Sequence, residues 1–133
     1  AEIAALADDL TFRSITLSDG TFDNRVTIRY RTTSNQISAI VEGNNVVAFN
    51  SNFTSSDITV LTKIALTYKS GDVALWVNGV EVLTSASSFT TIGLSDLSFN
   101  NGIGGDSFEG KVKDLRTYNT ALTDAELQTL TTI

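Results

Sequence analysis

The chain has 133 residues, with 9 Lys plus Arg against 15 Asp plus Glu, which gives a formal net charge of −6. This length is typical of one domain, and the acidic balance argues against nucleic acid or an anionic membrane as a general partner, since both need a basic surface. The absence of His and Cys removes the usual catalytic triad, most zinc sites and disulfides from consideration.

The first half of the chain predicts short strands separated by polar turns. Ala1 to Leu6 reads as a strand already in progress, and the chain lacks an initiator Met, so we expect it to be the C-terminal part of a longer chain. Alternating apolar residues predict strands at 12–17, 25–31, 36–41 and 46–49. Residues 18–24 and 50–57 are expected to be loops, because turn-forming residues dominate them.

The centre of the chain carries the clearest hairpin signal. Residues 63–69 and 72–78 alternate in polarity, and Asn78 and Gly79 follow directly. Asn-Gly between alternating apolar residues is typical of a type I′ turn, which needs positive φ at both central positions. A β-meander is therefore predicted here.

The last third predicts two more strands and one helix. A short strand is expected near residues 97–99, and a Gly-rich loop then leads to a strand at 110–118. Thr123 and Glu126 have the spacing of a capping box, and Leu122, Leu127 and Leu130 would dock the short helix on the sheet edge. Many short strands with antiparallel turn signals indicate an all-β fold: an antiparallel β-sandwich with one short C-terminal helix, formed by residues 1–133 as a single domain.

One predicted strand carries an unusual row of arginines. Arg25, Arg29 and Arg31 share one face, and the opposite face carries Val26, Ile28 and Tyr30, which we expect to be buried. Guanidinium groups bind carboxylates and sulfates in bidentate fashion, so this face is a candidate site for an acidic glycan. The alternative is a solvated strand face paired with neighbouring carboxylates of this chain or of an adjacent subunit.

Two further groups are candidates for ligand contact. Trp76 is the only Trp, and its ring would either stack on a sugar or pack between structural elements. Asn100 and Asn101, in the Gly-rich loop, are included among the candidate ligand-binding residues.

A calcium site is a second hypothesis. Asp19, Asp23 and Asn24 lie in one loop, and Asp106 lies in the Gly-rich loop. Calcium binds six to eight oxygen ligands, which such loops supply, but neither loop has a defined calcium-binding spacing and turns use the same residue types. Plain loops are therefore the alternative.

The acidic residues do not favour catalysis. A glycoside hydrolase needs two carboxylates that face one another across the substrate. Glu42, Glu81 and Glu109 stand alone, and the adjacent Asp8 and Asp9 would point to opposite faces of a strand. We therefore expect no enzymatic activity.

Two segments, KIALTYKSGDVALWVNGVEV and FEGKVKDLRTYNTALTDAELQTL, resemble the laminin-G-like branch of the concanavalin A-like lectin/glucanase superfamily. In that family a hairpin ending in Asn/Asp-Gly precedes a Gly-led strand, a Tyr-Asn/Ser-x-Ala-Leu turn and a short acidic helix. The positions that match are Phe108, Gly110, Lys111, Asp114, Arg116, Tyr118, Ala121, Leu122, Thr123, Asp124, Glu126 and Leu127. With ADDLTFRSITLSDGT and DNRV ahead of these segments, the chain is similar to domains of bacteriophage tail-fibre and other virion proteins.

The resemblance implies a jelly-roll sandwich and a choice between two functions. The first is a non-catalytic, lectin-like adhesion or receptor-binding domain of a phage virion, which recognises a cell-surface glycan and has calcium as its only candidate cofactor. The second is a purely structural module for fibre assembly or capsid decoration. Both imply a virion or extracellular location, contacts with other virion subunits and a homo-oligomer, with neither nucleic acid nor membrane as partner.

Overall fold

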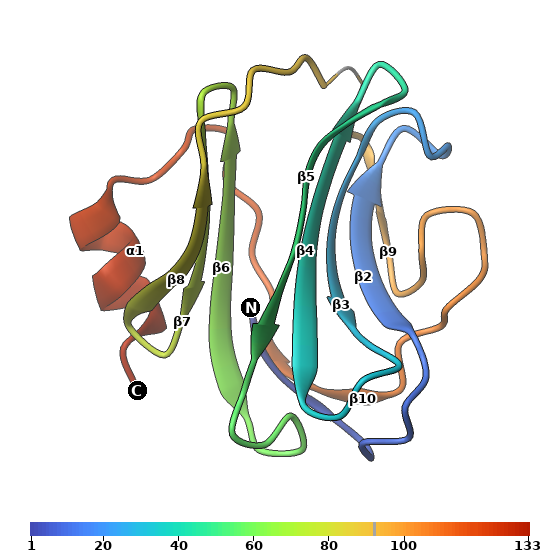
Figure 1. The fold of residues 1–133 in the computed structure, drawn as a ribbon, viewed down its shortest axis with the longest axis vertical. Helices are drawn as coiled ribbons and strands as arrows, with labels where there is room; N and C mark the ends of the chain where they lie inside the picture. Colours follow the sequence, from blue (N-terminus) through green and yellow to red (C-terminus); the bar gives the residue numbers. More distant parts are fainter. Residues whose placement is uncertain (92) are drawn as a thin grey trace.

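The computed structural model describes residues 1–91 and 93–133, which form two five-stranded antiparallel sheets packed face to face (Figure 1). Sheet I has the strand order β10-β1-β6-β7-β8, and sheet II has the order β5-β4-β3-β2-β9. The strands are β1 (Glu2–Ala5), β2 (Arg13–Ser18), β3 (Arg25–Tyr30), β4 (Gln36–Gly43), β5 (Val46–Thr54), β6 (Thr62–Lys69), β7 (Asp72–Val77), β8 (Val80–Ser85), β9 (Asp96–Ser98) and β10 (Gly110–Asp114). The predicted β-sandwich is confirmed.

The core lies between the two sheets and follows from the alternation along each strand. Val26 and Tyr30 of β3, Ile37 of β4 and Leu75 of β7 all point inward and are buried. Burying each such side chain stabilises the fold by about 1.5–3 kcal/mol. The inward set is the one that the alternation predicts for β3, although Ile28 is only partly buried. Arg25 and Arg29 of β3, and Arg31 directly after it, lie on the outer face of sheet II.

The predicted Asn-Gly turn is confirmed. Asn78 and Gly79 have φ angles of 48° and 85°, and Val77 pairs with Val80 on either side of them. Positive φ at both central positions is the type I′ requirement, which Gly meets without steric strain and Asn tolerates. This turn fixes the register of β7 against β8.

The helix α1 (Asp124–Thr131) begins at the predicted capping box. The Thr123 hydroxyl accepts a hydrogen bond from the Glu126 backbone N–H at 3.3 Å, and the Glu126 carboxylate accepts one from the Thr123 N–H at 2.8 Å. Leu127 is buried against the outer face of sheet I, where α1 packs in Figure 1. Across residues 1–91 and 93–133 no helix has the length and apolar character needed to span a membrane.

Two predicted boundaries are wrong. The run at 50–57 is not all loop, because β5 continues to Thr54 and its polar residues pair with β4, as in Asn52 with Ser38. The strand predicted at 110–118 ends at Asp114, opposite Glu2, the residue at which its antiparallel partner β1 begins. A strand needs a neighbour to satisfy its backbone groups, so the sequence pattern alone cannot place its end.

Candidate ligand-binding site

The candidate site lies on the outer face of sheet II, where antiparallel register brings Phe12 beside the arginines of β3. Ser14 of β2 pairs with Arg29, so Phe12, two residues earlier, lies diagonal to Arg29 on the same face. We call Phe12, Arg25, Arg29 and Arg31 the arginine face. All four side chains are partly buried.

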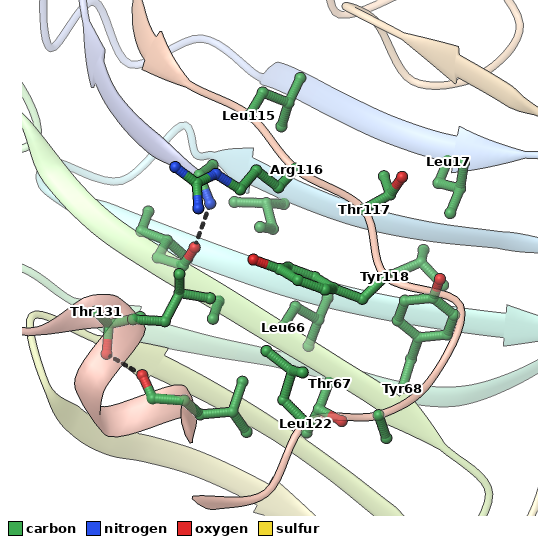
Figure 2. A pocket seen from close by; sticks show the side chains of 18 of the residues that line it. Leu17, Leu66, Thr67, Tyr68, Leu115, Arg116, Thr117, Tyr118, Leu122 and Thr131 are labelled. Carbon is green, nitrogen blue, oxygen red and sulfur yellow. Dashed lines mark hydrogen bonds between the residues drawn. The ribbon is translucent and has the colours of Figure 1, made fainter. Parts of the chain in front are cut away.

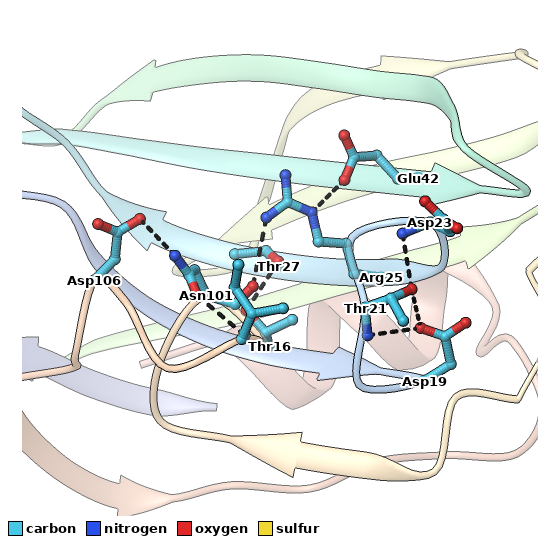
Figure 3. A network of polar contacts seen from close by, with 10 residues as sticks. Thr16, Asp19, Thr21, Asp23, Arg25, Thr27, Glu42, Asn101 and Asp106 are labelled. Carbon is cyan, nitrogen blue, oxygen red and sulfur yellow. Dashed lines mark hydrogen bonds and ion pairs between the residues drawn. The ribbon is translucent and has the colours of Figure 1, made fainter.

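Arg25 is held by protein groups. Its Nε donates to the Glu42 carboxylate across the β3–β4 ladder, and its Nη1 donates to the Asn101 carbonyl at 3.4 Å (Figure 3). Its guanidinium carbon also lies 4.1 Å from the centroid of the Phe22 ring, a cation–π distance. Arg25 therefore matches the interpretation in which an arginine pairs with a neighbouring carboxylate.

Arg29 has a different environment. Its guanidinium carbon lies 4.1 Å from the centroid of the Phe12 ring, and within the described residues it makes no hydrogen bond or ion pair. Its Nε is buried without a partner. Burial, followed by repulsion from the Arg31 guanidinium, lowers the pKa of Arg29 below the usual range. A guanidinium is effectively never deprotonated in a protein, so Arg29 is treated as a cation at neutral pH.

Arg31 completes the cationic pair. Its Nη1 donates to Asn52 Oδ1 at 3.0 Å and to Ser38 Oγ at 3.3 Å, both of which are neutral acceptors. Its guanidinium carbon lies 5.8 Å from the Phe12 centroid. In the described part of the chain no carboxylate forms an ion pair with Arg29 or Arg31, whereas Arg25 has Glu42.

The Gly-rich loop runs beside this face and is shaped by its own side chains. Asn100 Oδ1 accepts from the Gly102 N–H at 2.7 Å, and Asn101 Oδ1 accepts from the Ile103 and Gly105 N–H groups at 3.1 and 3.0 Å. These oxygens shape the loop, and Asn101 joins it to Arg25 through its carbonyl. The structure thus brings Asn101 into contact with Arg25.

The acidic loops are also engaged internally. Asp19 accepts from the Thr21 backbone and hydroxyl at 2.9 and 2.6 Å and from the Asn24 amide at 2.9 Å, and these bonds lower the pKa of Asp19. Figure 3 shows Arg25 between Asp19 and Asp106, and the Asp23 backbone N–H donates to the Thr21 hydroxyl, which in turn donates to Asp19. In residues 1–91 and 93–133 no three acidic side chains gather where they would share a metal ion. The calcium site stays a prediction, and the function proposed below does not depend on it.

Trp76 lies in sheet I and is not brought together with the arginines. Its side chain is 8% exposed and packs with Ala65, Ala74 and Leu127 beneath α1. This placement agrees with the packing interpretation of Trp76, because little of the residue is exposed.

Sequence reasoning missed the two aromatic residues of the arginine-bearing surface. Phe12 and Phe22 each lie against a guanidinium, and neither was a candidate. Alternation along residues 12–17 places Phe12 on the outer face with Ser14 and Thr16, but only the β2–β3 register shows that Arg29 is its neighbour.

Comparison with known protein families agrees with the fold. A family model described as the concanavalin A-like lectin/glucanases superfamily matches residues 5–128. A crystal structure of an S-layer domain-containing protein (residues 221–444) from Clostridium thermocellum ATCC 27405 is similar at 14% sequence identity and a TM-score of 0.46. The match covers 95% of this chain but only 65% of that one. Among curated proteins, none matches the chain.

Proposed function

Because the chain belongs to the concanavalin A-like lectin/glucanase superfamily, we propose that it is a non-catalytic domain that binds an anionic glycan through Arg29 and Arg31. The observation that supports this proposal is the state of Arg29, a half-buried guanidinium with no ion pair or hydrogen bond among the described residues. A fold alone does not name a function, so the argument depends on this residue and its neighbours.

The physical reason is electrostatic. A partly desolvated cation beside a second cation is unfavourable unless an anion neutralises it. Here the Asp106 and Glu42 carboxylates act on Arg29 without forming an ion pair with it, and Arg31 has neutral acceptors. A carboxylate or sulfate ester would accept paired hydrogen bonds from the planar guanidinium, which the Phe12 ring holds in place. A hydrogen bond of this charged type contributes about 1.5–3 kcal/mol, or roughly tenfold to a hundredfold in affinity.

The setting that we propose is the surface of a phage particle, which follows from the resemblance of the chain to tail-fibre domains. Several copies in one homo-oligomeric fibre would raise the avidity for a repeated surface glycan without any new contact. The binding test does not depend on this setting.

The experiment is a glycan array that holds neutral, carboxylated and sulfated glycans, probed with the 133-residue chain. We expect saturable binding to carboxylated or sulfated glycans, which falls about tenfold or more in Arg29→Ala. Arg29→Lys keeps the charge but loses the planar guanidinium and its paired donors, so we expect its binding to fall as well.

The matched control is Arg116→Ala, which removes an exposed arginine that lies away from the arginine face and pairs with Asp114. Its binding should equal that of the wild type, and thermal unfolding should show that every variant is folded. Preference for neutral glycans, an equal loss in Arg116→Ala, or loss of binding in EDTA would contradict the proposal. The EDTA result would move the site to the loops that contain Asp19 and Asp106. If the chain binds no glycan on the array and forms a multimer in solution, the result would favour the structural module.

A further inference from the structure

Asp106 lies on the opposite side of β2 from Arg29 and does not pair with it. The Asp106 carbonyl accepts a hydrogen bond from the Ser14 N–H at 2.9 Å, and Ser107 forms a bridge with Ser14. On its other side, Ser14 is opposite Arg29 in the β2–β3 ladder. The backbones of Asp106 and Arg29 are therefore about two strand spacings apart, roughly 10 Å, with Ser14 between them.

The side chains of Ser14 and Arg29 lie close together because of the hydrogen-bond pattern. The Ser14 N–H bonds to Asp106, so Ser14 and Arg29 form a pair without backbone hydrogen bonds, in which side chains approach most closely. Ser14 is 0% exposed, whereas Arg29 and Asp106 are partly exposed. A ligand on this face would therefore meet the guanidinium and the carboxylate and not the hydroxyl beneath them.

The Asp106 carboxylate is held by its own loop. Its Oδ2 accepts from the Asn101 amide at 3.4 Å, and the Asn101 carbonyl in turn accepts from Arg25 (Figure 3). Its Oδ1 accepts no hydrogen bond in the described chain, and no ion pair joins Asp106 to an arginine there. Asp106 has a φ angle of 51°, in the left-handed region that Asp and Asn tolerate better than most residues. The carboxylate can therefore accept a hydrogen bond from a ligand.

Asp106 acts electrostatically on Arg29 even without a contact. Burial and then the Arg31 charge lower the pKa of Arg29, and the Asp106 charge opposes that shift. The face thus presents two cations, Arg29 and Arg31, and an anion beside them. An anionic group of a ligand is favourable at the arginines, but a second one beside Asp106 is repelled. A hydroxyl is favourable there, because an O–H donor forms a short, strong hydrogen bond with a carboxylate.

The cleft shown in Figure 2 does not offer this combination of groups. It has a volume of about 1400 Å³ and lies beside β6, and Leu66, Leu115 and Leu122 are among its lining residues. The arginine that lines it, Arg116, pairs with Asp114 at 2.9 Å. Within the described chain, an anionic sugar would therefore meet no arginine in this cleft that lacks an ion pair.

We propose that Asp106 is a specificity-determining residue, which accepts a hydrogen bond from a sugar hydroxyl next to the acidic group that binds Arg29. The inference rests on the proposed function and narrows its ligand class. Among acidic glycans, the site selects those that carry one anionic group beside a free hydroxyl and rejects those in which that hydroxyl is sulfated. Specificity of this kind uses repulsion of the wrong ligand as well as attraction of the right one.

The test compares two chondroitin tetrasaccharides, one unsulfated and one sulfated at a single hydroxyl of each hexosamine. They differ only in whether a hydroxyl or a second anion accompanies each carboxylate. Their affinities are measured by calorimetric titration for the wild type, Asp106→Asn and Arg29→Ala. Because Asn keeps the size of the side chain and tolerates the same left-handed backbone, Asp106→Asn removes the charge alone.

The matched control is Asp72→Asn, which removes one negative charge from the exposed start of β7 in sheet I. We expect the wild type to bind the unsulfated form at least about tenfold more tightly than the sulfated form. Asp106→Asn should bind the sulfated form more tightly than the wild type does and bring the ratio of the two affinities close to one. Asp72→Asn should keep the wild-type ratio, and the Tm of each variant should show that it is folded.

Equal binding of the two forms by the wild type, or a preference for the sulfated one, would overturn the inference. The same conclusion would follow if Asp106→Asn changed both affinities by the same factor. If Arg29→Ala weakens binding of both forms while Asp106→Asn leaves their ratio unchanged, the role of Asp106 is refuted and the proposed function is not. If neither form shows Arg29-dependent binding, this inference is refuted, and the glycan array decides the proposed function separately.

Discussion

Removal of Glu42 tests whether Arg25 has a structural role, in contrast to the ligand-binding role that we propose for Arg29. After Glu42→Ala, the only side-chain polar or ring contacts that remain to Arg25 in the described chain are a 3.4 Å hydrogen bond to the Asn101 carbonyl and the Phe22 ring. The Arg25 and Glu42 side chains are 12% and 14% exposed, so water screens the pair only partly.

The expected magnitude follows from that burial. Exposed ion pairs contribute about 0–1 kcal/mol, and breaking a fully buried pair costs about 3–5 kcal/mol. A pair of intermediate exposure should lie between these ranges, so we expect Glu42→Ala to lower the free energy of unfolding by about 2–3 kcal/mol. In a double-mutant cycle with Arg25→Ala, the coupling free energy should be about 2 kcal/mol.

The assay is urea unfolding of the wild type, both single variants and the double variant, with unchanged m-values as the sign that the transition stays comparable. The matched control is the cycle for Arg116 and Asp114, whose side chains are 59% and 40% exposed and whose coupling should stay below about 1 kcal/mol. Equal coupling free energies in the two cycles would refute the reasoning. The Arg25–Glu42 ion pair would then stabilise the fold no more than an exposed pair does, and Arg25 could not be called a structural arginine.

Three further predictions concern stability. Tyr30→Phe should leave the free energy of unfolding unchanged or raise it by up to about 1 kcal/mol in urea unfolding, because the Tyr30 hydroxyl is buried without a partner in the described chain. Gly110→Ala should lower that free energy by about 1–3 kcal/mol, since a Cβ there would overlap the Ala4 carbonyl oxygen. Hydrogen bonds from Thr123 lower the pKa of Glu126, so the stability that its charge adds is present above the ordinary carboxyl pKa and lost as pH falls through the lowered one. The Tm advantage of the wild type over Glu126→Gln should therefore disappear on acidification, and an advantage that persists in strong acid would contradict this account.

Local sequence signals were enough to predict the fold. The Asn78-Gly79 turn and the Thr123–Glu126 capping box involve residues close in the chain, whose preferences act within a few residues. Alternation along β3 correctly separated the buried residues from the arginines, because one face of that strand must fill the core. The errors, at residues 50–54 and 115–118, arose where the presence or absence of a distant partner strand decides the outcome.

The candidate site was predictable only in part for the same reason. The sequence shows that Arg25, Arg29 and Arg31 share a face, but the neutralisation of Arg25 by Glu42 depends on the β3–β4 register. The contact of Arg29 with Phe12 depends in turn on how the loop at 19–24 closes β2 against β3. Long-range register is set by the whole sheet, so no short motif reveals which arginine lacks a partner.

The central claim is that Arg29 binds an anionic group of a glycan, and calorimetric titration tests it most directly. The wild-type chain and Arg29→Ala are each titrated with the strongest glycan from the array and with the same glycan after its carboxylates are reduced or its sulfates removed. We predict that the wild type binds the charged form at least about tenfold more tightly, and that Arg29→Ala binds both forms equally weakly. Equal affinity of the wild type for the two forms, or an unchanged preference in Arg29→Ala, would contradict the account.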